Sequence, residues 1–185
     1  MAETAKGRLL VATPVLVDAN FARTVLLMIE HSDDGALGVV LNRPSETAVG
    51  DPLPRWDDLA APPELIFVGG PVAPDVAVCL GRLRPGQREG RGMQLISPGV
   101  VTLDLDTEPD EVAPTVGDLR IFAGYAGWGA GQLEDELGEG AWVIVDAFPD
   151  DFHTAEPLGL WRAVLRRQRS ALALLANHPV DARRN

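Results

Sequence analysis

Hydrophobic positions along this chain fall mostly in short runs, separated by clusters of glycine and proline. Apolar runs of about four to eight residues bounded by turn-forming residues are typical of β-strands, and strict alternation indicates a strand with one face in solvent. This pattern predicts about eight strands. They lie within GRLLVAT, NFARTVLLMIEH, LGVVLN, LIFVGGPV, DVAVCLG, VVTLDLD (the alternating one), LRIFAGY and AWVIVDAF.

Helical patterns are fewer. QLEDEL (132–137) and PLGLWRAVLRRQR (157–169) are expected to be helices, and RWDDLA (55–60) is at most a short one. In the last long segment Trp161, Val164 and Leu165 share one face, and Pro179 ends any continuation through SALALLANH. Prolines and a glycine predict a loop in RPSETAVGDPLP (43–54).

The order of these elements predicts an α/β fold of the α+β kind. The strands do not alternate regularly with long helices, so a doubly wound sheet is not expected. No repeat, low-complexity tract or linker divides the sequence. We therefore expect residues 1–185 to form a single domain, a size that suits one core.

Charge, cysteine content and the absence of long apolar stretches limit the possible partners and the cellular location. The net charge is −11, from 27 acidic and 16 basic residues, and such a surface repels nucleic acid and anionic membranes. Cys79 is the lone cysteine and lies in an apolar run, so a small core residue is expected there, without a disulfide. No signal peptide is recognisable, and no apolar stretch reaches the ~18 residues of a spanning helix. We expect a cytoplasmic protein that does not engage a membrane.

The segment GYAGWGAGQLEDEL (124–137) tests the idea of a phosphate-binding loop. Its glycine spacing does not match G-x-G-x-x-G, and no Lys-Ser or Lys-Thr pair follows the last glycine. The acids at the start of the following helix would also repel a phosphate. We therefore expect a structural turn just after Tyr125, formed with the glycines Gly124, Gly127, Gly129 and Gly131. An alternative keeps this turn and lets Gln132 and Glu134 face a shallow groove.

No recognised catalytic or metal motif is present. Glu30 and His31 are adjacent on a predicted strand, so their side chains point to opposite faces unless a bulge intervenes. The histidines lack metal-ligand spacing, and the acidic segment from Asp104 lacks the glycine and glutamate of a calcium loop. The serines match no nucleophile elbow. The sequence thus predicts no catalytic residue, no metal and no cofactor.

The C-terminal segment is the one clearly basic part of the chain. Arg162, Arg166 and Arg169 are spaced so that they share a helix face, which makes them candidate contacts for an anion. Cations near a helix C-terminus also complement its dipole, and a solvated face is the competing interpretation. No aromatic residues alternate with the arginines, so contact with nucleic acid is the less favoured reading.

Three segments in the same order resemble the YqgE/AlgH family of bacterial proteins. They are GRLLVATPVLVDANFARTVLLMIEHSDDGALGVVLNRP, FVGGPV and RIFAGYAGWGAGQLEDELGEGAW, and the resemblance runs from about Gly7 to Trp161. It implies a mixed, branching β-sheet with a small closed β-barrel, surrounded by a few helices. The family is largely uncharacterised. Some members are called transcriptional regulators, although no helix-turn-helix signature is visible here.

The resemblance also points to particular polar residues. The family's recurrent polar positions correspond here to Glu30, His31, Asn42, Gln132 and Glu134, and Pro44 and the Gly70-Pro71 pair shape the backbone. After Trp161 the chain departs from many relatives, which leaves the length of the last helix open.

These observations lead to a principal hypothesis and two alternatives. The principal hypothesis is a non-enzymatic binding or regulatory protein with a protein or small-molecule partner. Its groove would lie near LNRP and GQLE and include Arg43. One alternative is an enzyme that gathers Glu30 or His31 with Asn42, Arg43 and Glu134 in one pocket. The other is a protein that binds DNA through the basic last helix.

Overall fold

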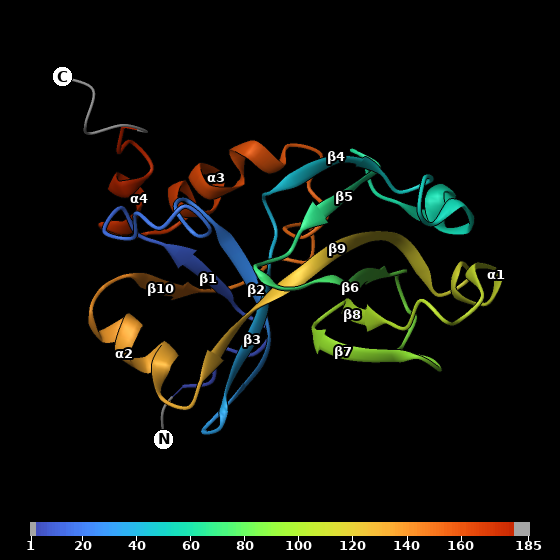
Figure 1. The fold of residues 1–185 in the computed structure, drawn as a ribbon, viewed down its shortest axis with the longest axis horizontal. Helices are drawn as coiled ribbons and strands as arrows, with labels where there is room; N and C mark the ends of the chain where they lie inside the picture. Colours follow the sequence, from blue (N-terminus) through green and yellow to red (C-terminus); the bar gives the residue numbers. More distant parts are fainter. Residues whose placement is uncertain (1–2, 180–185) are drawn as a thin grey trace.

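The computed structural model describes residues 3–179, and its central feature is a ten-stranded, mostly antiparallel sheet (Figure 1). The strands run in the order β10-β1-β2-β3-β9-β6-β8-β7, and β4 and β5 branch from this path. Their bounds are β1 (Leu9–Ala12), β2 (Val25–Ser32), β3 (Gly35–Val40), β4 (Pro44–Ala48), β5 (Leu65–Val68), β6 (Val72–Leu83), β7 (Met93–Ser97), β8 (Val100–Leu103), β9 (Val116–Gly129) and β10 (Trp142–Val145).

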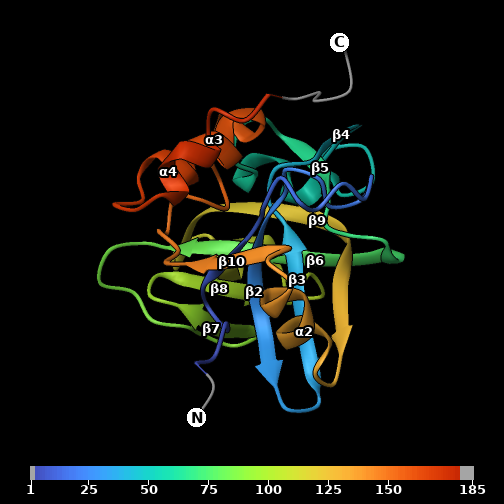
Figure 2. The same ribbon diagram turned by 90° about the vertical axis from the view of Figure 1, so that its left-hand side faces the viewer.

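The helices are all short. The α-helices are α1 (Pro109–Val112), α2 (Gln132–Gly138), α3 (Leu160–Arg166) and α4 (Leu172–Leu175), and the 3-10 helices are η1 (Pro54–Leu59) and η2 (Pro157–Gly159). Within residues 3–179 none is long and apolar enough to cross a membrane. Helix α2 contacts β3, β9 and β10, whereas α3 packs with α4 at the other end of these strands (Figure 2).

Strand β9 is the point at which the sheet branches. Along one edge, β9 pairs first with β5, which runs parallel to it, and then with β3, which runs antiparallel. Along the opposite edge, β9 pairs with β6. The remaining paired strands of the described sheet are antiparallel. The fold is therefore α+β, and a branching sheet agrees with the expectation from the sequence.

The small closed barrel expected from the resemblance is not shown. The sheet curls into a half-barrel, and β10 and β7, at its two ends, form no ladder with each other within the described residues. The chain just before β1 approaches β7 closely, because a Cβ added to Gly7 would lie 2.6 Å from the carbonyl oxygen of Ile96. The segment before β1 thus packs against β7 without forming a ladder with it.

The first three strands are buried on both faces. Leu9, Val11 and Leu27 point into a core that α3 closes with Trp161, whereas alternate residues such as Leu26 face a second core beneath α2. Because both faces are covered there, β2 begins with an unbroken apolar run, residues 25–29, rather than an alternating one. This is the physical reason that the segment was recognisable as a strand.

The glycine-rich segment differs from its expected conformation. Strand β9 does not end near Tyr125 but continues to Gly129, because Gly127 and Gly129 pair with Leu37 and Gly35 of β3. The turn comes after Gly129, where Gly131 has a φ of 75° and precedes α2. The sequence suggested a turn after Tyr125 because glycine weakens a strand. The hydrogen bonds between β9 and β3 keep these glycines in the strand instead.

Other elements also depart from the sequence-based expectations. Part of the predicted loop 43–54 forms β4, which pairs with β5 through Pro44 and Ala48 across an irregular register. Strand β7 was not predicted; it has five residues, of which Gln94 and Leu95 are exposed. The last long helix ends at Arg166, and the chain then bends before α4.

Two glycine-containing segments cross in backbone contact where the sheet branches. A Cβ on Gly69 would lie 2.3 Å from the oxygen of Gly124, and one on Gly70 would lie 2.2 Å from the carbonyl carbon of Tyr125. Gly124 has a φ of 75°, and its Cβ would lie 2.6 Å from the oxygen of Gly70. Pro71 follows on the surface. Any side chain at these glycines would push β5 and β9 apart.

Arg120 of β9 is a charged residue in the core, with 1% of its surface exposed. Its guanidinium lies 4.2 Å from the centre of the Phe67 ring. It donates hydrogen bonds to four backbone carbonyls, those of Ala61, Pro62, Phe152 and Thr154. Burial lowers the pKa of Arg120 to about 10. The side chain therefore ties β9 to two loops through its hydrogen bonds.

Replacing Gly124 by alanine should destabilise the fold by about 2–4 kcal/mol, because the substitution combines a positive φ with a backbone clash. Urea denaturation measures this change. Gly129→Ala is the matched control in the same strand, since no atom lies within 4 Å of its Cβ position. Equal losses from the two substitutions would contradict the role assigned to the crossing.

Arg120→Met should cost about 3 kcal/mol or more, because the buried carbonyls that it serves lose their donors. Thermal or urea unfolding would measure the loss. Arg88→Met, on an exposed loop, should change stability by less than about 0.5 kcal/mol. An Arg120→Met protein as stable as Arg88→Met would show that the hydrogen bonds do not hold the loops.

Candidate functional site

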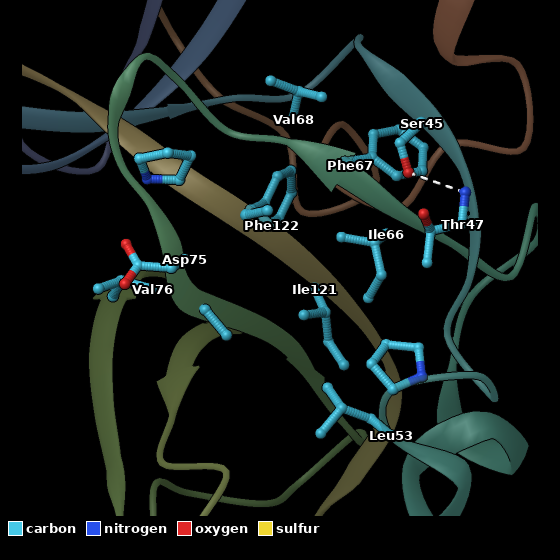
Figure 3. Close-up of a pocket in the computed structure, with 14 residues that line it drawn as sticks. Ser45, Thr47, Leu53, Ile66, Phe67, Val68, Asp75, Val76, Ile121 and Phe122 are labelled. Carbon is cyan, nitrogen blue, oxygen red and sulfur yellow. Dashed lines mark hydrogen bonds between the residues drawn. The ribbon is translucent and has the colours of Figure 1, made fainter.

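A largely apolar pocket of about 440 Å³ lies beside the branch of the sheet, where β4, β5, β6 and β9 come together (Figure 3). Such a volume falls in the range of sites that bind small molecules. The lining residues are Ser45, Thr47, Pro52, Leu53, Ile66, Phe67, Val68, Pro74, Asp75, Val76, Ala77, Ile121, Phe122 and Ala123.

The strands place alternate residues on the pocket face. Ile66 and Val68 are separated by one residue on β5, as Ile121 and Ala123 are on β9, so each pair points the same way. Ile66 and Ile121 lie near the middle of Figure 3, and Leu53 lies below them. Ile121 is buried, whereas 47% of Val68 is exposed, so the pocket has a buried floor and an open apolar rim.

One wall of the pocket is an irregular segment of β6. Val72 pairs with Tyr125 and Ala77 with Ala123, so the residues between them have no partners on β9. Within this segment Ala73 has a φ of 45°, and Pro74 lacks a backbone donor. The segment therefore stands away from the sheet as a wall and resists pairing with another strand.

Polar groups are few in the lining. The Ser45 hydroxyl oxygen accepts a hydrogen bond from the Thr47 backbone N–H at 3.1 Å, as drawn in Figure 3. Asp75 is the charged member and lies on the wall formed by β6, and the lining residues include no lysine, arginine or histidine. The chemistry of the pocket thus suits an apolar body that carries few polar groups.

Sequence reasoning did not identify this pocket. A signal was present, because LIFV and RIFA place apolar residues on both faces of β5 and β9. That pattern is equally typical of strands buried on both sides, and the sequence does not show that the bulge of β6, beside the branch, leaves one face uncovered.

The polar residues predicted as one groove fall into separate groups. His31 and Glu134 do meet, with 2.7 Å between His31 Nε2 and Glu134 Oε1. His31 Nδ1 accepts a hydrogen bond from the Ala5 backbone N–H at 2.9 Å, so the ring proton lies on Nε2 and is donated to Glu134. This hydrogen bond, and one from its own backbone N–H, lower the pKa of Glu134.

Glu30 lies apart from this pair. Its carboxylate is exposed and lies 3.5 Å from the ammonium group of Lys6. The bulge in β2 occurs between Met28 and Glu30, before the Glu30-His31 pair rather than within it. The adjacent side chains therefore keep the opposite directions expected of a strand.

Gln132 belongs to a network centred on Glu136. Gln132 accepts a hydrogen bond from the Gly129 backbone N–H and donates one to Glu136. The other carboxylate oxygen of Glu136 accepts hydrogen bonds from the indole N–H groups of Trp128 and Trp142, at 2.9 Å and 2.7 Å. These bonds fasten α2 to β9 and β10. Glu136 was not singled out from the sequence because it looked like one member of an acidic run.

Asn42 and Arg43 lie at the opposite end of β2. Asn42 accepts from the Val25 N–H, at the start of β2, whereas His31 is near its end. At ~3.3 Å per residue these positions are about 20 Å apart. The structure therefore does not bring all six residues together, and an enzyme site that combines Asn42 with Glu134 is not formed. A binding role for either group stays a prediction.

The three arginines predicted to share one face of the last helix do not all lie on that helix. Arg162 and Arg166 lie on the exposed face of α3, whereas Arg169 comes after the helix has ended. Arg23, from the loop before β2, lies near Arg162, with its guanidinium 4.7 Å from the centre of the Trp161 ring. Burial, and secondarily the charge of Arg162, lower the pKa of Arg23. The arginines at 183 and 184 lie outside the described residues.

Other candidate chemistry is limited in the described part of the chain. No group of three or more potential ligands that could hold a metal ion is found among residues 3–179. Cys79 is buried, and burial raises the pKa of its thiol. Such a thiol resists ionisation and is unsuited to nucleophilic attack.

Comparisons with known proteins agree with the resemblance seen in the sequence. A family model described as DUF179, AlgH-like, matches residues 9–173. A UPF0301 protein of Streptomyces coelicolor is 52% identical, over 95% of this chain and 92% of its own. The crystal structure of protein DIP2367 from Corynebacterium diphtheriae has a TM-score of 0.90 at 34% identity, covering 94% of this chain and 92% of that one.

The solution structure of the AlgH protein from Pseudomonas aeruginosa is similar as well. It has a TM-score of 0.69 at 31% identity and covers 98% of this chain and all (100%) of that chain. The matching family model, the extensive identity to UPF0301 proteins and the shared fold lead to one conclusion. This chain belongs to the AlgH-like (UPF0301) family.

Proposed function

We propose that this AlgH-like protein acts by binding a compact, mainly apolar small molecule in the pocket between β4, β5, β6 and β9. The observation that carries the proposal is the pocket itself, whose lining is mostly aliphatic and aromatic and whose floor is buried. Burying about 200 Å² of apolar ligand surface contributes about 5 kcal/mol before the cost of association. This supports weak binding, at about the millimolar level, rather than tight binding.

The few polar groups would orient the ligand. The hydroxyls of Ser45 and Thr47 lie on β4, and the Asp75 carboxylate lies on the wall formed by β6. A ligand with a hydroxyl or amine at one end would satisfy these groups while its apolar body contacts Ile66 and Ile121. A carboxylate or phosphate on the ligand would be repelled by Asp75 because no cation lies in the lining.

Binding is favoured over catalysis by the composition of the lining. Ser45 Oγ contacts the Thr47 backbone, and no described hydrogen bond joins either hydroxyl to a side-chain base. Activation of a hydroxyl nucleophile requires such a base within hydrogen-bond reach. His31 and Glu134, which do contact each other, lie outside the lining.

A regulatory role in the cytoplasm belongs to the same proposal. Val68, Val72 and Val76 are exposed near the rim, so an occupied pocket would change the apolar surface that a partner meets. A buried, unpaired thiol at Cys79 suits a reducing compartment.

The neutral dye N-phenyl-1-naphthylamine can test the pocket, because its fluorescence rises in apolar sites. We expect saturable binding to the wild-type protein. Ala77→Trp, at an exposed lining position, should fill the pocket and weaken binding about tenfold or more. Circular dichroism would verify that the variant folds.

Leu158→Trp is the matched control, since Leu158 is 82% exposed and does not line the pocket. It should change dye affinity by less than about twofold. Absence of saturable dye binding, or equal weakening by both tryptophan substitutions, would contradict the proposed site.

A further inference from the structure

Two cationic side chains from distant parts of the sequence lie near each other at α3. Arg23 lies at the end of the loop between β1 and β2, and Arg162 is on the exposed face of α3. The Arg23 guanidinium stacks on Trp161, which is adjacent to Arg162 in the helix. The proximity of the two charges also lowers the pKa of Arg23, after the larger effect of burial.

The loop is fixed so that Arg23 is presented at this place. Asn42 donates a hydrogen bond to the Arg23 carbonyl at 2.9 Å. The Arg43 guanidinium donates to the carbonyls of Ala19 and Ala22 at 3.1 Å and 2.9 Å. Arg23 itself has a φ of 57°, a conformation that costs energy for a residue with a side chain. The polar residues of the LNRP segment thus hold a strained residue in position.

The positive charges lack an acidic counterpart in the described structure. No ion pair to a described acid involves Arg23, Arg43 or Arg162. Asp18 lies in the same loop, but its carboxylate accepts from the Asn20 N–H. One Arg23 N–H group donates to the carbonyl of His178. Neighbouring cations without a counter-charge are unfavourable, and a bound anion would offset this repulsion.

We propose that Arg23 and Arg162 form a binding site for the phosphate group of a small molecule, with Asn42 and Arg43 as positioning residues. Guanidinium groups match phosphate because they donate parallel hydrogen bonds to its oxygens. A small ligand fits better than a nucleic acid, because the chain as a whole carries a charge of −11 and would repel a long polyanion. The site is separate from the apolar pocket and does not depend on it.

Inorganic pyrophosphate is the probe, and NMR of the ¹⁵N-labelled full chain at low salt is the measurement. Saturable shifts should appear at the backbone amides of 18–24 and at Trp161, whose indole N–H donates to the Ala12 carbonyl. Arg162→Gln removes a side chain that makes no described hydrogen bond, so the fold should persist. It should weaken pyrophosphate binding about tenfold, the usual effect of losing a charge-assisted hydrogen bond.

Arg169→Gln is the matched control, because it removes the same charge from an exposed residue beyond α3. It should weaken binding less than about twofold. Equal weakening by the two variants, or no saturable shift at millimolar pyrophosphate, would overturn the site. A second titration uses a single-stranded oligodeoxynucleotide. Binding of the oligonucleotide without binding of pyrophosphate would overturn the assignment to a small molecule.

Discussion

The crossing of Gly69 and Gly70 with Gly124 is the constraint on which the rest of the structure depends. Backbone lies directly against backbone there, so β5 can join β9 on the same edge that β3 occupies farther along. The Gly69 N–H donates to the Ala123 carbonyl, and the Gly69 carbonyl accepts from the Val40 N–H. One residue thus links β3, β5 and β9. The branch that results leaves one sheet face uncovered between β4 and β6, and this face is the apolar pocket.

Polar side chains at the two ends of the β2–β3 pair fix the neighbouring segments of the chain. Asn42 satisfies the backbone on both sides of Thr24, and Arg43 holds the carbonyls of the loop between β1 and β2. His31 and Glu134 similarly join the hairpin to α2 and to the chain before β1. The main role of these residues is to form hydrogen bonds between segments far apart in the sequence. Any contact that they help make with a ligand is indirect, as in the presentation of Arg23.

The sequence was sufficient for much of the fold but not for its sites. Continuous apolar runs identified the doubly buried strands, because burial on both faces leaves no polar position. Periodicity could not show that Gly127 and Gly129 extend β9, since that depends on pairing with β3. Nor could it show that Arg120 is buried, because its partners are carbonyls of distant loops. The family resemblance supplied recurrent polar positions such as Asn42 and Glu134, but their separation along β2 required the three-dimensional structure.

Hydrogen exchange at the branch tests the central claim most directly. If the glycine crossing holds the sheet together, the amides of Val40 and Gly69 should exchange only through global unfolding. Their rates should then match that of Met28, whose N–H donates to the Arg8 carbonyl between β1 and β2. Exchange at Val40 and Gly69 about a hundredfold or more faster than at Met28 would mean that the branch opens locally. That result would contradict the account, because the sheet would then stay folded while the glycine crossing beside the pocket is open.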